Sequence, residues 1–360
     1  MIEKFTVSRD DTWYHAWPDL ALTPSGKLVC VFSECTHHFD RTHTRIVVCS
    51  SDDRGRTWSG KRQVTEPLRK SPSVNSYWNC PRVTCLRDGR MVVVIDRIAG
   101  RKEEVAGPYG ELTYWLYFSS AEGETWEGAV ATPIQGIVPD QLLELRQGPH
   151  TGRWLITAHS AGTSTVQDGV WRQNLWFSDD QGSSWSGPHL IAGVPELKLC
   201  EANILPLTTG ELVCFLRENS WRGLDVFRAI SRDGGTTWGE LTTLPIPGCH
   251  RPVAGLLHSG NILLTYRFLQ GGTTRQPSAQ NFLAALLSPE DALAPARDEA
   301  STRILPVDYD RHPKPDLGYS GWVQFPDGEI YIVNYIKDDA PNGQIRGYSL
   351  REDEFVLGSP

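Results

Sequence analysis

Charged and aromatic residues stand at two fixed distances from a glycine that recurs six times along the chain. These glycines are Gly26, Gly89, Gly152, Gly210, Gly260 and Gly328. Nine residues before them stand Trp17, Cys80, Glu201, Arg251 and Tyr319, with Val138 at the shifted place in the third copy. Seven residues after them stand Ser33, Asp96, His159, Arg217, Arg267 and Tyr335. In an antiparallel hairpin these two positions lie at the same open end, so the sequence predicts that these side chains gather at one place.

The residue types in these two columns are mostly charged or aromatic, and arginines are natural partners for an anion. Because charged groups at the ends of apolar strands must be solvated or paired, we expect one polar mouth. Its predicted members are Glu201, Tyr319, Arg217, Arg251, Arg267, Asp96 and His159.

The elements that carry these columns are six copies of one β-hairpin. They lie at residues 15–34, 79–97, 138–160, 199–219, 249–268 and 318–335. Each copy pairs an alternating or apolar strand with a glycine turn and a second, solidly apolar strand, which is typical of sheets buried on both faces. In the last copy, GYSGWVQFPDGEIYIVNY, the turn is Pro326-Asp327-Gly328.

A second short motif recurs between the hairpins. It reads SSDDRGRTW at 50–58, SSAEGETW at 119–126, SDDQGSSW at 178–185 and SRDGGTTW at 231–238. An acidic side chain in such a turn accepts backbone hydrogen bonds, the glycine permits a positive φ, and the tryptophan packs beside the turn. We interpret these motifs as structural. Their tryptophans are spaced at about the length of one propeller blade.

Together the repeats predict an all-β fold, a six-bladed β-propeller formed by residues 1–360 as a single domain. The strand at residues 3–9 has no hairpin of its own, so we expect it to complete the last blade and close the ring. The fifth blade lacks the short motif and has LSPEDALAP instead, so we expect that blade to be the least regular, with a possible helical turn within 288–300.

Composition excludes several classes of function. The net charge of −8 gives no electrostatic footprint for nucleic acid. The start of the sequence has no apolar segment typical of a signal peptide, and no run of 18 apolar residues predicts a membrane span. The eight cysteines are scattered within apolar strands, which favours free thiols and a cytoplasmic location. No motif predicts a metal or a cofactor.

The four motifs and six hairpins resemble the sialidase (neuraminidase) superfamily, whose Asp boxes decorate a six-bladed propeller. CEANILPLTTGELVCFLREN resembles the segment that carries a glutamate and a substrate-binding arginine, here Glu201 and Arg217. GYSGWVQFPDGEIYI resembles the segment with the nucleophilic tyrosine, here Tyr319. The loop ECTHHFDRTHTR at 34–45 corresponds to the loop with the acid/base aspartate, which implies Asp40. His37, His38 and His43 surround Asp40 and could bind substrate or transfer the proton instead.

Two departures from this superfamily concern its three carboxylate-binding arginines. The first would stand in Tyr14-His15-Ala16-Trp17-Pro18, which contains no arginine. The third would fall in 278–287, where Gln280 and Asn281 stand, with Arg275 nearby. Arg251 and Arg267 could form a rearranged anion site with Arg217.

The resemblance implies a retaining exo-glycoside hydrolase that releases a terminal acidic sugar, such as sialic acid, from an oligosaccharide or glycoconjugate. Tyr319 would attack the anomeric carbon, Glu201 would take its proton, and Asp40 would protonate the leaving group. Two alternatives stay open. One is a glycosidase of this fold for another sugar, with Trp17, His37 and His38 in place of the missing arginines, and the other is a carbohydrate-binding propeller without catalysis.

Overall fold

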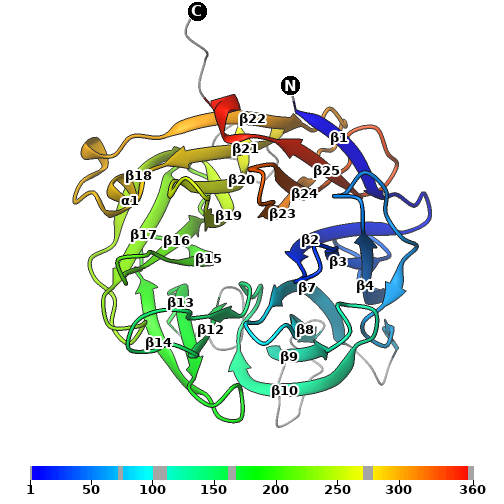
Figure 1. The fold of residues 1–360 in the computed structure, drawn as a ribbon, viewed down its shortest axis with the longest axis horizontal. Coiled ribbons are helices and arrows are strands. Elements are labelled where there is room, and N and C mark those ends of the chain that lie inside the picture. The colour runs from blue at the N-terminus through cyan, green and yellow to red at the C-terminus, as the bar shows by residue number, and fades with distance from the viewer. Residues whose placement is uncertain (1, 72–75, 100–111, 161–167, 271–278, 356–360) are drawn as a thin grey trace, which may run out of the picture.

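Six β-sheets are arranged as blades around a central axis in the computed structural model, which describes residues 2–71, 76–99, 112–160, 168–270 and 279–355 (Figure 1). The six-bladed propeller predicted from the repeats is therefore confirmed. Arg275 of the sequence prediction lies outside the described residues.

The first three blades follow the chain from the first hairpin onward. The first contains β2 (Tyr14–Leu22), β3 (Leu28–Cys35), β4 (His43–Ser51), β5 (Arg62–Gln63) and β6 (Leu68–Arg69), of which the last two both pair with β4. The second contains β7 (Ser76–Cys85), β8 (Met91–Ala99), β9 (Leu112–Ser119) and β10 (Glu127–Gln135). The third contains β11 (Leu143–Glu144), β12 (Trp154–His159), β13 (Arg172–Ser178) and β14 (Ser186–Gly193).

The last three blades complete the ring. The fourth contains β15 (Leu199–Pro206), β16 (Leu212–Glu218), β17 (Asp225–Ser231) and β18 (Thr242–Pro247). The fifth contains β19 (Cys249–Leu256), β20 (Ile262–Gln270), β21 (Ala279–Leu287) and β22 (Arg303–Tyr309). The sixth contains β23 (Leu317–Gln324), β24 (Ile330–Ile336), β25 (Gln344–Leu350) and, from the other end of the chain, β1 (Glu3–Ser8).

The ring closes through an antiparallel pair between β1 and β25, in which Glu3 lies opposite Ser349 and Phe5 opposite Gly347. Figure 1 shows the blue β1 alongside the red β25. This confirms the expectation that the N-terminal strand completes the last blade. The pairing leaves no open strand edge where the chain begins and ends its circuit.

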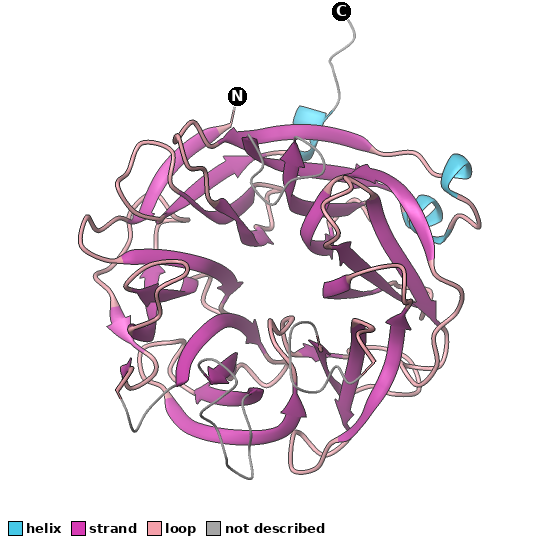
Figure 2. Cartoon of the chain, turned by 180° about the vertical axis from the view of Figure 1, so that it is seen from behind, coloured by secondary structure: helices cyan, strands magenta, loops and turns pink. Residues whose placement is uncertain are grey.

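Helical structure within the described residues is short and lies at the rim (Figure 2). It consists of α1 (Pro289–Leu293) and the 3-10 helices η1 (Arg297–Glu299) and η2 (Glu352–Phe355). Ser288 caps α1 by accepting a hydrogen bond from the Asp291 backbone, so the predicted helical turn is present. None of the described helices has the length and apolar character needed to cross a membrane.

The expectation that the fifth blade is the least regular was wrong. Its β20 and β21 pair over nine consecutive residues without a shift. The third blade is less regular, because its innermost strand β11 has only two residues, Leu143 and Glu144.

The recurring Ser-Asp-Gly-Thr-Trp motif is a hydrogen-bonded turn, as the sequence predicts. In its first copy Ser51 Oγ accepts a 2.8 Å bond from Gly55 N, and Asp53 accepts bonds from Thr57 N at 2.8 Å and from Thr57 Oγ1 at 2.6 Å. Trp58 Nε1 donates to Gly55 O at 3.1 Å. The side chains of these turns therefore serve the fold.

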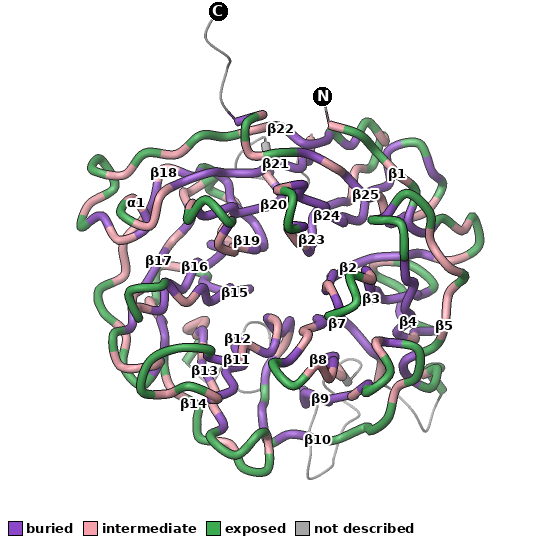
Figure 3. The backbone as a smooth tube through the Cα atoms, viewed as in Figure 1, coloured by how far each residue is buried: buried purple, intermediate pink, exposed green. Residues whose placement is uncertain are grey.

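The inner and middle strands of the blades are buried, whereas exposure is concentrated in the turns and outer loops (Figure 3). Apolar clusters fill the spaces between neighbouring blades, for example the cluster that contains Leu20, Phe32 and Tyr331. The eight cysteines are free thiols, and seven of them are buried. This packing gives the strand ends near the axis a rigid frame.

Candidate active site

A cavity of about 690 Å³ opens at one end of the ring, where the inner strand ends converge. Four elements of the sequence prediction meet in it: the first, fourth, fifth and sixth hairpins. Its polar and aromatic lining residues are Tyr14, Trp17, His37, His38, Phe39, Glu201, Arg217, Trp221, Arg267, Gln280, Lys314, Asp316, Tyr319, Tyr335 and Lys337. The volume is typical of small-ligand sites.

The shortest polar contact between the predicted catalytic residues joins Tyr319 to Glu201. The Tyr319 hydroxyl donates a 2.6 Å hydrogen bond to Glu201 Oε1. The other carboxylate oxygen, Oε2, accepts a 2.7 Å bond from Arg217 Nη1, and Arg217 Nη2 donates to Asn219. Tyr319, Glu201 and Arg217 are each less than 10% exposed. The structure thus brings these three predicted residues together.

The electrostatics of this triad fix its resting protonation state. Burial alone would raise the pKa of Glu201, but Arg217, His159 and Arg267 outweigh it and lower the pKa to about 2. Burial and the Glu201 charge raise the pKa of Tyr319 well above its usual value. At neutral pH the pair is therefore a neutral phenol hydrogen-bonded to an ionised carboxylate.

β-Bulges occur in the innermost strands at the first column, of which Trp17, Glu201 and Tyr319 line the cavity. The pairing of inner and second strands shifts at Ala16/Asp19, Trp78/Pro81, Cys200/Asn203, His250/Val253 and Leu317/Ser320. Trp17 and Glu201 lie within these bulges at φ values of 52° and 46°. A bulge leaves one residue unpaired and changes the direction of its side chain. The same irregularity therefore occurs at the start of the inner strand in each of these five blades.

In the sixth blade the bulge depends on Gly318, which has a φ of +110°. A Cβ atom at this position would lie 2.3 Å from the Cβ atom of Arg267. Only glycine fits this combination of conformation and contact. Gly318 therefore places both the Tyr319 ring and the backbone carbonyl of Leu317, which accepts a 3.1 Å bond from Arg267 Nη1.

Three predicted mouth residues lie behind the cavity rather than on it. Arg251 is fully buried, donates to Pro139 O at 2.8 Å, and holds its guanidinium 5.3 Å from the centre of the Tyr319 ring. His159 accepts a 3.4 Å bond from the Glu201 backbone, and burial lowers its pKa to about 4, so it is neutral at neutral pH. Asp96 accepts bonds from Asn79, Cys80 and Val138.

These contacts give the three residues supporting positions. The bonds of Asp96 tie the second blade to the segment before the third blade. The hydrogen bond to His159 holds the backbone of Glu201, and the guanidinium of Arg251 lies over the face of the Tyr319 ring. The predicted anion site of Arg217, Arg251 and Arg267 does not form as a single cluster on the cavity, because Arg251 is not among the lining residues.

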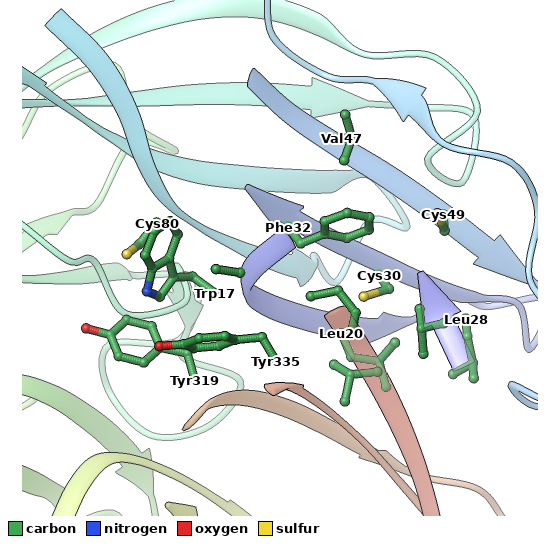
Figure 4. Close-up of a cluster of buried hydrophobic side chains, with 14 of the residues drawn as sticks. Trp17, Leu20, Leu28, Cys30, Phe32, Val47, Cys49, Cys80, Tyr319 and Tyr335 are labelled. Carbon is green, nitrogen blue, oxygen red and sulfur yellow. The ribbon is translucent and has the colours of Figure 1, made fainter. Parts of the chain in front are cut away.

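Trp17, Tyr335 and Tyr319 form an aromatic wall of the cavity. The ring centres of Trp17 and Tyr335 are 6.0 Å apart, and those of Tyr335 and Tyr319 are 6.4 Å apart. Figure 4 shows the three rings close together, tilted or edge-on to one another. His38 packs edge-on against Trp17 at 5.2 Å, and His37 packs against Tyr14 at 5.3 Å.

Asp40 lies outside this arrangement. Its side chain is exposed, and its Oδ1 accepts a 2.9 Å bond from Thr42 N and a 2.6 Å bond from Thr42 Oγ1. The turn directs His37, His38 and Phe39 toward the cavity, while Asp40 faces its own loop. Arg41 holds this turn in place, since it donates to His38 O and its guanidinium lies 3.9 Å from the Trp17 ring centre.

The sequence analysis missed Asp316 and Tyr14. Asp316 Oδ1 accepts a 2.9 Å bond from the Tyr335 hydroxyl, and its Oδ2 accepts bonds from Tyr14 and from His38. Both residues stand twelve positions before a turn glycine, Gly328 and Gly26. A third column at that distance would have found them.

One carboxylate–histidine cluster outside the cavity has the spacing of a metal site. Asp10, His15 and Glu34 bring their ligand atoms within 4.8 Å of one another. The ammonium of Lys61 bonds to all three, at 2.9 Å to Asp10, 3.2 Å to His15 and 2.6 Å to Glu34. A cationic side chain thus already occupies the centre of the cluster, and these residues do not fit a metal ion.

Comparison with protein families gives an assignment for most of this chain. The model of the family described as BNR repeat-like domain matches residues 86–332, more than half of the chain. The chain belongs to this family. The BNR repeat-like match includes Glu201, Arg217, Arg267 and Tyr319, whereas the loop that carries His38 precedes it.

Solved structures share the fold of this BNR repeat-like protein at low sequence identity. A protein of unknown function from Dyadobacter fermentans DSM 18053 is 20% identical, with a TM-score of 0.76 over 97% of this chain and 99% of that one. The Hadza microbial sialidase Hz136 is 17% identical, with a TM-score of 0.72 over 95% of this chain and 66% of that one. The intramolecular trans-sialidase from Ruminococcus gnavus is 15% identical, with a TM-score of 0.68 over 96% of both chains. The fold is that of sialidases.

Proposed function

We propose that this protein is a retaining exo-glycoside hydrolase that releases a terminal acidic sugar, with sialic acid as the first candidate and Tyr319 as its nucleophile. The observation that carries the proposal is the 2.6 Å hydrogen bond from the buried Tyr319 hydroxyl to the ionised Glu201, on the wall of the cavity. Glycosidases of the sialidase type use a tyrosine nucleophile in place of a carboxylate. The sialidases among the solved structures of this fold are consistent with the same chemistry.

The proposed first step uses the resting state of this pair. The Tyr319 oxygen attacks the anomeric carbon while its proton moves to Glu201, so a neutral nucleophile meets a substrate that carries its own carboxylate. A carboxylate nucleophile would be repelled by that substrate. The guanidinium of Arg251 behind the ring and that of Arg217 beside Glu201 stabilise the negative charge that the pair shares during the attack.

The charges on the cavity wall favour an anionic ligand. Arg217, Arg267, Lys314 and Lys337 line it, against the two carboxylates of Glu201 and Asp316. Within the described residues, no carboxylate forms an ion pair with Arg267 or Lys337. A carboxylate on the sugar would therefore meet unpaired cationic groups.

A second candidate function is hydrolysis of a different sugar by the same residues. Gln280 stands where the resemblance places the third carboxylate-binding arginine. Its Nε2 donates to Pro315 O at 3.0 Å, and its Oε1 accepts from Leu317 N at 3.2 Å. The amide is thus committed to the backbone of the segment before Tyr319. This observation favours another acidic or deoxy sugar over a sialoside.

A panel of aryl glycosides tests these proposals. We would assay the purified protein on an aryl sialoside, an aryl uronide and aryl deoxyhexosides, with Tyr319→Phe as the matched variant. Release of the aryl alcohol from the sialoside supports the first candidate, and release only from another glycoside supports the second. Loss of all release in Tyr319→Phe, with an unchanged thermal unfolding curve, supports the assigned nucleophile.

The panel also exposes a wrong assignment. Binding of a glycoside without release by the unaltered protein would favour the third reading, a carbohydrate-binding propeller. Turnover by Tyr319→Phe at the rate of the unaltered protein would exclude Tyr319 as nucleophile. The anomer formed first, followed by NMR, checks the expected retention of configuration.

A further inference from the structure

Two cavity residues that the nucleophile pair does not use form a histidine–carboxylate dyad. His38 Nδ1 lies 2.5 Å from Asp316 Oδ2, although the two residues are 278 positions apart in the chain. His38 comes from the loop between β3 and β4, and Asp316 immediately precedes β23, the strand that carries Tyr319. Both side chains line the same cavity as Tyr319.

Asp316 is held as an ionised acceptor. The hydroxyls of Tyr14 and Tyr335 donate to its carboxylate, in addition to the contact with His38. Burial would raise its pKa, but His38 and Tyr14 outweigh this effect and lower the pKa to about 2. The carboxylate therefore carries no proton to give at neutral pH, and it fixes the hydrogen of His38 on Nδ1.

Packing fixes the plane of the His38 ring. The centre of the His38 ring lies 5.2 Å from that of Trp17, which packs edge-on, and 4.5 Å from that of Phe39. The His38 carbonyl also accepts a 2.7 Å bond from Arg41 Nε. With Nδ1 committed to Asp316, Nε2 is the ring nitrogen left for a ligand in the cavity.

Other titratable and charged groups lie near this dyad. His37 precedes His38 in the loop, and burial and the charges of His38 and Lys337 lower the pKa of His37. The charge of Arg267, from β20, contributes to the lowered pKa of Asp316. Asp40, by contrast, is engaged by Thr42 and exposed on the far part of the turn. His38 therefore lines the cavity and can carry a proton there, whereas Asp40 does not line it.

We propose that His38 is the acid/base residue of the glycosidase and that Asp316 is its positioning residue. This inference rests on the proposed function. In the first step, protonated His38 gives the Nε2 proton to the glycosidic oxygen as its bond to the anomeric carbon breaks, while Tyr319 forms its bond to that carbon and its proton passes to Glu201. The leaving group departs as a neutral alcohol.

In the second step, neutral His38 takes a proton from a water molecule that attacks the anomeric carbon. The bond from this carbon to the Tyr319 oxygen breaks, and that oxygen regains its proton from Glu201. Both residues return to their starting protonation states, and the sum is hydrolysis of one glycosidic bond.

The dependence of rate on the leaving group tests this assignment. We would measure kcat/KM for aryl glycosides of the accepted sugar whose phenols span pKa values of about 4 to 10, using His38→Ala, His38→Gln and Asp40→Ala. General acid catalysis contributes roughly 10²- to 10⁴-fold. We expect a loss of that size in both His38 variants for the most basic phenol and a much smaller loss for the dinitrophenyl glycoside. Asp40→Ala should follow the leaving-group dependence of the unaltered protein.

The second step has its own signature. With the dinitrophenyl glycoside, His38→Ala should release a burst of phenol equal to the enzyme present, and added azide should restore turnover with formation of a glycosyl azide. Asp316→Asn should lower kcat for the basic phenols while leaving KM nearly unchanged, because it removes the carboxylate that accepts from Nδ1 and orients the His38 ring. His258→Ala, on an exposed turn, is the matched histidine control.

The outcomes separate the two levels of the proposal. If the unaltered protein releases no phenol from any activated glycoside, both the proposed function and this inference fail. If it is active and the His38 variants show its leaving-group dependence, or if Asp40→Ala shows the burst and the azide effect, only the inference fails. Thermal unfolding of each variant identifies one that is merely unfolded, and His38→Gln then replaces His38→Ala.

Discussion

The hydroxyl of Tyr319 is hydrogen-bonded to Oε1 of Glu201 at 2.6 Å, although 118 residues separate them in the chain. The contact joins the sixth blade to the fourth. It depends on a bulge at the head of each inner strand, since an unbulged strand would alternate its side chains in a different register.

Glu201→Gln should affect both activity and stability. The amide cannot take the Tyr319 proton, so we expect a loss of roughly 10²- to 10⁴-fold in kcat. It also leaves the buried Arg217 without its carboxylate, which should lower the free energy of unfolding by about 3 kcal/mol. Urea denaturation measures the second effect.

Tyr319→Phe is the matched control for stability, because it removes one hydrogen bond and no charge. We expect a decrease of about 1 kcal/mol in the free energy of unfolding. Equal destabilisation by the two variants would show that the Glu201–Arg217 ion pair contributes no more to stability than the hydrogen bond.

Acidification should destabilise the fold in two successive windows. The unfolded chain protonates a histidine at its ordinary pKa of 6.5, whereas burial lowers the pKa of His159 to about 4 in the folded protein. The unfolded state therefore binds more protons between these values, and stability falls as the pH drops from about 6.5 to 4. Glu201, with a pKa lowered from 4.5 to about 2, adds a loss between those values.

Urea midpoints between pH 7 and pH 2.5 check this prediction. His159→Gln should reduce the loss of stability in the upper window, to which His250, whose pKa is also lowered by burial, contributes as well. Glu201→Gln should reduce the loss in the lower window, to which Asp316 also contributes. A midpoint that stays constant down to pH 4 in the unaltered protein would contradict the assignment of a buried neutral His159.

Ala121→Asp should stabilise the second blade. Ala121 stands where the other three recurring turns have Asp53, Asp180 and Asp233, and each of those accepts bonds from the residue four positions on. The new carboxylate would meet Thr125 in the same way. Because the turn is exposed, we expect a rise in Tm of only about 2 °C. Asp53→Ala, the reverse change in an intact turn, should lower Tm.

Gly318→Ala should be far more disruptive than an alanine at another turn glycine. The new Cβ atom would lie 2.3 Å from that of Arg267, so β20 and β23 would have to separate. We expect a loss of more than about 3 kcal/mol in the free energy of unfolding, together with loss of activity.

Gly260→Ala is the control for this change. Gly260 also has a positive φ, of +92°, but a Cβ atom there would meet nothing within 4 Å. Its cost should be about 1–2 kcal/mol, from backbone conformation alone. Equal effects of the two substitutions would show that the contact with Arg267 does not constrain the strand.

The fold was predictable from the sequence because each blade repeats the same alternation, turn glycine and strand length. Spacing from the turn glycine located Glu201, Arg217 and Tyr319, because the inner strands that carry Glu201 and Tyr319 have a bulge at the same distance from that glycine. Arg251 belongs to the same column, yet its guanidinium turns back toward Pro139 O and leaves the cavity. This orientation depends on the segment between the second and third blades, which hairpin spacing does not describe.

The loop that carries His38 shows the other limit of sequence reasoning. Whether His38 or Asp40 faces the cavity depends on Arg41, whose guanidinium lies on the Trp17 ring and holds the His38 carbonyl. Asp316 escaped notice because it stands outside both columns. These contacts link distant segments, and no local pattern contains them.

The pairing of β1 with β25 also sets an order of events during synthesis. Glu3 emerges first, and its partner Ser349 is added 346 residues later, which at ribosomal rates takes on the order of 20–70 s. Throughout that time β1 has no strand to join, and the sixth blade cannot form. Strand β23, which carries Tyr319, belongs to this blade, so the hydrogen bond between Tyr319 and Glu201 forms only when translation of the ring is nearly complete.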